Sequence, residues 1–152
     1  MAGDANSSRD RIAHCCCEQL RAKTTGEPLI VITCFCEECQ RRTASAFGIS
    51  TYWMREHVEL SGSATRYVRE GQNGRKATYY FCPTCGSSVH WELPDRRPGQ
   101  LGISGGSFCD KDFPAPSMSV WERSKPGWIS IPASARFMEN PPPPPIPTRV
   151  PH

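Results

Sequence analysis

The segment FCPTCG at residues 81–86 carries the strongest structural signal in the chain. A Cys-x-x-Cys pair in a tight turn brings two sulfur atoms onto one metal ion. Pro83 favours the turn, and Gly86 can adopt the positive φ with which the chain leaves it. A redox dithiol is the alternative, but the flanking sequence lacks the βαβ pattern of thioredoxin-like proteins. We therefore interpret Cys82 and Cys85 as half of a zinc site, which requires two further ligands.

The segment HCCCEQL at residues 14–20 offers the other half of that site. Side chains at positions i and i+2 of an extended segment face the same side, and a bend can draw Cys15 and Cys17 together. Cys16 would then face the opposite side, where we expect a small, buried, apolar residue. A zinc site closed by four sulfur ligands is structural in character.

The segment TCFCEECQRR at residues 33–42 contains a third group of cysteines, which we call the triplet: Cys34, Cys36 and Cys39. All three can reach one tetrahedral zinc, and no fourth ligand is apparent nearby, since Glu37 and Glu38 are poorly placed by their spacing. Cys109 is an alternative fourth ligand, but we expect it to pack within its own loop. Three protein ligands and one open position are typical of a catalytic or substrate-binding zinc. The sequence thus predicts two Zn²⁺ ions per chain, with the triplet site partly empty.

Composition narrows the setting of these sites. The chain has 152 residues, nine of them cysteine, and a formal charge of +3. It shows no apolar signal segment and no apolar run of the roughly 18 residues that would span a bilayer. We therefore expect a cytoplasmic protein without a membrane partner, in which disulfides are disfavoured. Seven thiolates on two zinc ions would cancel the charge, and the basic residues form no stripe, so no nucleic-acid partner is expected.

Short β-like segments punctuated by Pro and Gly fill most of the chain and predict a mainly β domain. The segment FGISTYWM at 47–54 alternates like a half-buried strand. ATRYVRE and KATYYFC flank GQNG, which is a strong hairpin signal. One short helix is expected within residues 36–46. The predicted organisation is a disordered tail at 1–10, a zinc domain at 11–138 and a proline-rich tail at 139–152.

Taken together, these motifs resemble the family of glutathione-dependent formaldehyde-activating enzymes, also called the CENP-V/GFA domain. HCCCEQL, GEP, CFCEECQRRTASAF, FCPTCGSSV and the closing GGSFCDKDFPAP carry the resemblance, which runs from about residue 12 to about residue 138. Phe35 and Ala44-Ser45 stand where the family often has His and Gly-Ser. The resemblance is therefore to the broad superfamily rather than to the formaldehyde enzyme itself.

The resemblance implies an Mss4-like fold of several small, coiled, antiparallel sheets built around zinc. It implies that Cys15, Cys17, Cys82 and Cys85 bind a structural zinc and that the triplet binds a labile, catalytic one. The implied reaction is that of a carbon–sulfur lyase acting on a thiol–aldehyde adduct, such as S-hydroxymethylglutathione or an adduct of a related small thiol. Arg41 and Arg42 follow the triplet directly and are candidates for offsetting its negative charge or binding a substrate carboxylate, with a solvated charge pair as the alternative. Ser45 is a candidate for a hydrogen bond to a ligated sulfur, with the capping of a turn as the alternative.

A second class of function is a non-catalytic zinc domain that serves as a binding or scaffold module. Folds related to Mss4 include such binding proteins. The coordination of the triplet separates the two hypotheses. An exchangeable fourth position supports the enzyme, whereas a fourth protein ligand, or no metal at all, supports the scaffold.

Overall fold

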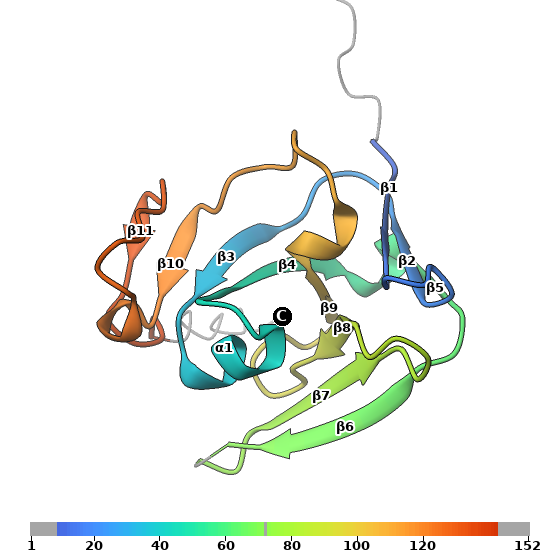
Figure 1. The fold of residues 1–152 in the computed structure, drawn as a ribbon, viewed down its shortest axis with the longest axis horizontal. Coiled ribbons are helices and arrows are strands. Elements are labelled where there is room, and N and C mark those ends of the chain that lie inside the picture. The colour runs from blue at the N-terminus through green and yellow to red at the C-terminus, as the bar shows by residue number, and fades with distance from the viewer. Residues whose placement is uncertain (1–8, 72, 143–152) are drawn as a thin grey trace, which may run out of the picture.

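The computed structural model describes residues 9–71 and 73–142. These residues form eleven strands, one α-helix and three short 3₁₀ turns (Figure 1). The strands are β1 (Arg11–His14), β2 (Arg21–Thr24), β3 (Ile30–Cys34), β4 (Gly48–Met54), β5 (Val58–Ser61), β6 (Thr65–Glu70), β7 (Lys76–Phe81), β8 (Ser88–Glu92), β9 (Gln100–Ser104), β10 (Met118–Val120) and β11 (Ala135–Arg136). The helix α1 spans Glu37–Thr43, and the 3₁₀ turns span Arg55–His57, Gly105–Phe108 and Glu122–Ser124.

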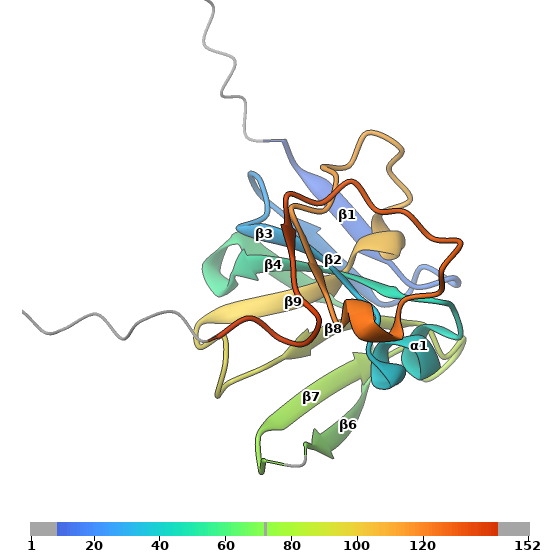
Figure 2. The same cartoon turned by 90° about the vertical axis from the view of Figure 1, so that its left-hand side faces the viewer.

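The strands assemble into two sheets. The smaller sheet has the antiparallel order β1-β2-β5, and the larger has the order β11-β10-β3-β4-β9-β8-β7-β6. Strand β10 runs parallel to both β3 and β11, and every other pair in the larger sheet is antiparallel. Figure 2 shows α1 and the β6–β7 hairpin near one end of the larger sheet. The mainly β fold expected from the sequence is confirmed.

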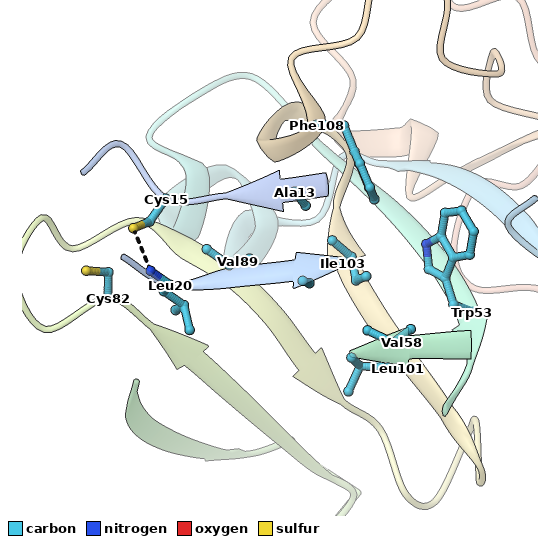
Figure 3. Packing of buried hydrophobic residues seen from close by; sticks show 11 residues of the cluster. Ala13, Cys15, Leu20, Trp53, Val58, Cys82, Val89, Leu101, Ile103 and Phe108 are labelled. Atoms are coloured by element: carbon cyan, nitrogen blue, oxygen red, sulfur yellow. Dashed lines mark hydrogen bonds between the residues drawn. The ribbon is translucent and has the colours of Figure 1, made fainter. Parts of the chain in front are cut away.

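The smaller sheet packs against the larger one and closes the main hydrophobic core. Fully buried Leu20 and Ala22 come from the segment that forms β2, whereas Leu101 and Ile103 come from β9. Figure 3 shows Leu20, Leu101 and Ile103 in one cluster, with the sulfur atoms of Cys15 and Cys82 at one end of it. Two buried ligand candidates are therefore part of the core itself, so a metal bound there would be coupled to folding.

Strand β4 is buried on both faces, which differs from the half-buried strand expected from its alternating sequence. Trp53 joins the main core, while Tyr52 points to the other face and packs in a second cluster with Ile32 and Val120. The polar residues of β4 are buried because they find partners. Thr51 Oγ1 donates to the Ile103 carbonyl at 3.0 Å and accepts from Trp53 Nε1 at 2.9 Å.

The predicted hairpin is formed by β6 and β7, which pair in continuous antiparallel register. Tyr67 lies opposite Tyr79, so residues 65, 67 and 69 of β6 share one face with residues 77, 79 and 81 of β7. The hairpin turn closes with the Gly71 N–H donating to the Arg75 carbonyl at 2.8 Å. Tyr67, Arg69 and Tyr79 of this face line one hollow together with Glu38, Arg41 and Arg42 of α1.

Helix α1 begins and ends with local hydrogen bonds. The Cys39 N–H donates to Cys36 Sγ at 3.4 Å, so the sulfur of a triplet cysteine caps the helix. The helix ends at Ala44, which adopts the left-handed conformation with φ 48° and ψ 38°. A side chain with a Cβ is disfavoured in this conformation, so a glycine would suit position 44 better than alanine does.

Replacing Ala44 with glycine should stabilise the protein by about 0.5 to 1 kcal/mol, because the left-handed strain is removed. Urea unfolding of the metal-loaded protein measures the change in the free energy of unfolding. Ala46→Gly is the matched control. Ala46 has no positive φ, and the added chain entropy should make that variant less stable. Equal destabilisation by both substitutions would contradict the role given to the left-handed turn.

Parts of the two predicted tails fall beyond the described structure, since residues 1–8 and 143–152 lie outside the described residues. The domain boundaries at 11 and 138 therefore remain predictions. Within the described ranges, no helix is long and apolar enough to cross a membrane.

Candidate functional site

Four cysteines from two distant segments come together beside the main core. The sulfur atoms of Cys15, Cys17, Cys82 and Cys85 all lie within 4.8 Å of one another. Cys17 Sγ is 3.6 Å from Cys15 Sγ and also 3.6 Å from Cys82 Sγ. Four sulfurs around a zinc, with Zn–S bonds of about 2.3 Å, lie about 3.8 Å apart. A disulfide needs about 2.05 Å. The spacing and the all-sulfur donor set therefore fit a zinc ion.

The surroundings of this four-cysteine cluster also suit thiolate ligands. Backbone N–H groups of Leu20 and Thr84 donate to Cys15 Sγ at 3.3 Å and to Cys82 Sγ at 3.4 Å. Gln19 Nε2 donates to Cys82 Sγ at 2.8 Å. Donors of this kind orient metal ligands and stabilise their charge. Hydrogen bonding to Ser87 lowers the pKa of Cys85 to about 5, which favours the thiolate that a metal requires.

The expectation for Cys16 was wrong, because this residue is exposed rather than buried. Residues 15–20 form a tight turn instead of an extended strand. The Glu18 N–H donates to the Cys15 carbonyl at 2.9 Å, and Glu18 has a φ of 64°. The side of this turn opposite the sulfur cluster faces solvent. Cys15 and Cys17 thus converge through a turn rather than through strand alternation.

The triplet forms the second cluster, where β3 passes into α1. The sulfurs of Cys34, Cys36 and Cys39 lie within 4.8 Å of one another. Within residues 9–71 and 73–142, no fourth Cys, His, Asp or Glu joins them. The donor set therefore fits a metal ion that keeps one coordination position for another ligand. Phe35, which lies between the first two cysteines of the triplet, is fully buried, with its ring centre 5.6 Å from that of Phe47.

The three sulfurs influence one another strongly. Hydrogen bonding with Cys34, then with Cys39, lowers the pKa of the Cys36 thiol, and the same hydrogen bonding with Cys36 raises the pKa of Cys34. Without a metal, the cluster thus favours one thiolate, at Cys36, surrounded by thiols that donate to it. Three neighbouring thiolates repel one another when no metal is bound. A bound divalent ion would stabilise all three thiolates together.

Three further side chains were predicted to contact substrate, and the structure places them differently. Arg41 is largely exposed and pairs with Glu37 at 2.8 Å and Glu38 at 3.4 Å. Arg42 folds inward over the aromatic rings of the larger sheet. Ser45 is exposed beyond the helix, where its N–H donates to the Gln40 carbonyl at 3.2 Å. Arg42 is the best placed of the three, because its guanidinium and the Cys39 side chain lie against the same residue, Gly48: a Cβ there would be 3.1 Å from Arg42 Nη2 and 3.4 Å from Cys39 Cβ.

Arg42 rests on an aromatic floor. Its guanidinium carbon lies 4.4 Å from the centre of the Trp91 ring and 5.6 Å from that of Tyr79. Trp91 is nearly fully buried and lies against Gly102 of β9. A Cβ at position 102 would lie 2.2 Å from Trp91 Nε1, so the indole can occupy this place only above a glycine. The glycine at position 102 therefore determines where the Trp91 ring lies, and the Trp91 ring supports the Arg42 guanidinium.

A hollow of about 360 Å³ lies between α1 and the β6–β7 hairpin. We call it the arginine pocket. It is lined by Arg41, Arg42 and Arg69 together with Glu38, Tyr67 and Tyr79. Sequence reasoning identified Arg41 and Arg42 but missed the contribution of the hairpin. The alternation of Tyr67 and Arg69 on one face of β6 is visible in the sequence, but the element that this face meets is not.

Two other residues lie away from the triplet. Cys109 is exposed, and its Sγ is 3.5 Å from the Gly106 carbonyl in its own loop. His90 is buried and stacks on Tyr80 with ring centres 4.6 Å apart. Burial, followed by the nearby charge of Arg55, lowers the pKa of His90 to about 4. Because Tyr80 lies on the opposite face of β7 from Tyr79, we assign His90 a packing role.

The fold and the two cysteine clusters define a mainly β domain suited to holding two metal ions. Comparison with protein families places residues 10–124 in the family described as glutathione-dependent formaldehyde-activating enzyme, GFA. The match covers well over half of the chain, so the protein belongs to the GFA family. The resemblance of its cysteine motifs to that family is confirmed.

Comparison with solved structures gives three matching chains. One is a Rhodobacter sphaeroides protein solved as a Northeast Structural Genomics target. It is 20% identical to this chain, with a TM-score of 0.49, and the match covers 63% of this chain and 85% of the other. No curated protein matches the chain.

Proposed function

We propose that the protein is a zinc-dependent carbon–sulfur lyase that forms or cleaves the adduct of a small thiol with an aldehyde. The single observation that carries the proposal is the triplet: three converging cysteine sulfurs with no fourth protein donor in the described residues. Membership of the GFA family supports the reaction class. In this proposal Cys34, Cys36 and Cys39 hold the reactive zinc, and Cys15, Cys17, Cys82 and Cys85 hold a structural one.

The proposed reaction adds a thiol across an aldehyde carbonyl. The new bond joins sulfur to the carbonyl carbon, the π pair moves to oxygen, and that oxygen takes up the proton that the thiol gives up. Cleavage of the adduct is the reverse. Zinc at the triplet would supply a position at which an incoming thiol ionises near neutral pH.

The chain contributes fixed geometry and charge to this reaction. The helix N-terminal turn and the end of β3 position the three cysteines, and the capping bond from the Cys39 N–H orients Cys36. Arg42 places a positive charge next to Cys39, since both side chains lie against Gly48, and its guanidinium packs on Trp91. None of the ion pairs among the described residues includes it. Such a charge offsets the net negative charge of about −1 that three thiolates and one Zn²⁺ would carry, which favours the approach of an anionic thiolate.

Cobalt substitution tests the proposal directly. With Co²⁺ at the triplet, addition of glutathione or 2-mercaptoethanol should intensify and shift the sulfur-to-metal charge-transfer absorption, because a fourth sulfur enters the coordination sphere. Cys109→Ser, which alters an exposed cysteine outside both clusters, should respond like the wild type. If no thiol changes this absorption and no thiol–aldehyde adduct is turned over, the lyase proposal fails and a non-catalytic zinc-binding module replaces it.

A further inference from the structure

The residue between the first two cysteines of the triplet is held by hydrogen bonds at both of its backbone groups. The Phe35 N–H donates to the Val120 carbonyl of β10 at 3.1 Å, and the Phe35 carbonyl accepts from Gln40 Nε2 at 2.8 Å. Phe35 is fully buried, so water cannot take the place of either partner. A buried carbonyl that loses its donor is strongly disfavoured. The Gln40 amide therefore holds the segment that joins Cys34 to Cys36.

Gln40 also belongs to the helix that carries the third cysteine. It follows Cys39 directly on α1, and its own N–H donates to the Cys36 carbonyl at 3.0 Å. The helix has only seven residues and none of them is buried, so neither its length nor a buried face fixes it in place. The position of Cys39 relative to the other two sulfurs thus depends on the side-chain hydrogen bond that ties the helix to the segment before it.

The same amide reaches a second carbonyl, which belongs to a turn that is itself held in place. Gln40 Nε2 lies 3.5 Å from the carbonyl of Ser124, the last residue of the 3₁₀ turn that follows Trp121. Trp121 has a φ of 59° and a ψ of 37°, a left-handed conformation that a bulky residue keeps only where its surroundings hold it. Here the Trp121 carbonyl accepts from the Ser124 N–H at 3.0 Å, and the Trp121 N–H donates to the Glu139 carbonyl at 3.2 Å. The NH₂ group of Gln40 is thus directed at two carbonyls from different segments, which fixes the orientation of the amide.

We infer that Gln40 is a positioning residue for the triplet: it keeps Cys39 at the distance from Cys34 and Cys36 that one metal ion requires. It acts through the Phe35 carbonyl, to which its amide donates, and not as a metal ligand. The inference rests on the proposed function only for the presence of a metal at the triplet. It concerns the geometry of that site and is independent of the thiol or aldehyde that the site processes. Hydrogen-bonding partners that orient metal ligands contribute about 10- to 100-fold to metal affinity.

The test is a titration of Co²⁺ into the triplet of the full chain, with zinc kept at the four-cysteine cluster. The sulfur-to-cobalt charge-transfer absorption gives the dissociation constant. Gln40→Met keeps the length of the side chain but removes its donor, so it should bind Co²⁺ about 10- to 100-fold more weakly than the wild type. Gln40→Asn keeps the amide but is one methylene too short to reach the Phe35 carbonyl, and it should be weakened similarly. The second variant keeps the test decisive if Gln40→Met folds poorly.

Gln100→Met is the matched control. Gln100 pairs with Met54 at one end of β4, whereas Cys34 of the triplet pairs with Gly48 at the other end. The Gln100 side chain accepts a hydrogen bond from Arg97 Nη1 at 3.2 Å, so this variant also removes the amide of a bonded glutamine. It should bind Co²⁺ at the triplet like the wild type.

Two results would overturn the inference. In the first, both Gln40 variants keep the wild-type affinity for Co²⁺, whatever their melting temperatures, which would make Gln40 an anchor of the helix only. In the second, Gln100→Met weakens Co²⁺ binding as much as the Gln40 variants do. Failure of the lyase proposal would look different. The wild type would then bind Co²⁺ at the triplet more tightly than Gln40→Met, but no thiol would change the absorption and no thiol–aldehyde adduct would be turned over.

Discussion

Cys82→Ser should leave almost no soluble, folded protein. Cys82 is fully buried in the main core, and its sulfur lies 3.6 Å from Cys17 Sγ and 2.8 Å from Gln19 Nε2. A structural zinc contributes about 10 kcal/mol or more to folding, whereas the total stability of a domain is on the order of 5–15 kcal/mol. Loss of one zinc ligand would therefore remove most of the free energy that favours the folded state. Soluble yield, circular dichroism and zinc content of the purified variant measure the effect.

Cys16→Ser provides the control for that experiment. Cys16 lies in the same turn but is exposed and belongs to neither cluster, so this variant should fold with two zinc ions. A Cys82→Ser protein that melts at the wild-type temperature would show that the four-cysteine cluster does not support the fold.

Removal of the metal from the triplet should, by contrast, leave the fold intact. All three of its ligands come from one short segment, residues 34–39, which β3 and α1 already hold in place. The four-cysteine cluster instead joins segments 65 positions apart, so a metal there restrains a long loop of the unfolded chain. Mild chelation should remove about one zinc equivalent first. The melting temperature should fall by no more than about 5 °C, which corresponds to about 1 kcal/mol.

Cys36→Ser should reproduce this partly loaded state without a chelator. The variant should fold, bind about one zinc ion and show no change in absorption when thiols are added to its cobalt form. Simultaneous release of both ions with cooperative unfolding, in either experiment, would mean that the two clusters do not have separate structural and reactive roles.

The cysteine clusters were accessible from the sequence because their geometry is largely local. Cys82 and Cys85 share one turn, and the triplet spans six residues, so spacing alone limits where the sulfurs can lie. The pair at Cys82 and Cys85 needs two more ligands, which Cys15 and Cys17 can supply, and the resemblance to a family agreed with that combination. Cys16 was predicted incorrectly because the residues around it form a turn with a positive φ at Glu18. A positive φ is usually predicted from a glycine, and the sequence has a glutamate at this position.

The arginine pocket could not be predicted in the same way. Arg69 is far from Arg42 in sequence. Both line the pocket because the larger sheet, in which β4, β9, β8 and β7 lie between β3 and β6, brings the hairpin near the helix that follows β3. Strand β4 was likewise judged half-buried from its polar residues. Thr51 is buried because its hydroxyl group is satisfied by a neighbouring strand, which is a long-range property that local alternation does not encode.

Gly102 influences the depth of the arginine pocket although it does not line it. The residue contacts no ligand in any of the proposals above, yet the missing side chain is what lets the Trp91 indole sink, and the indole sets the height at which Arg42 lies. An engineer who wished to enlarge this pocket would therefore change residues beneath its surface as well as those that line it. The residues that line the pocket set its charge, whereas the residues packed beneath them set its volume.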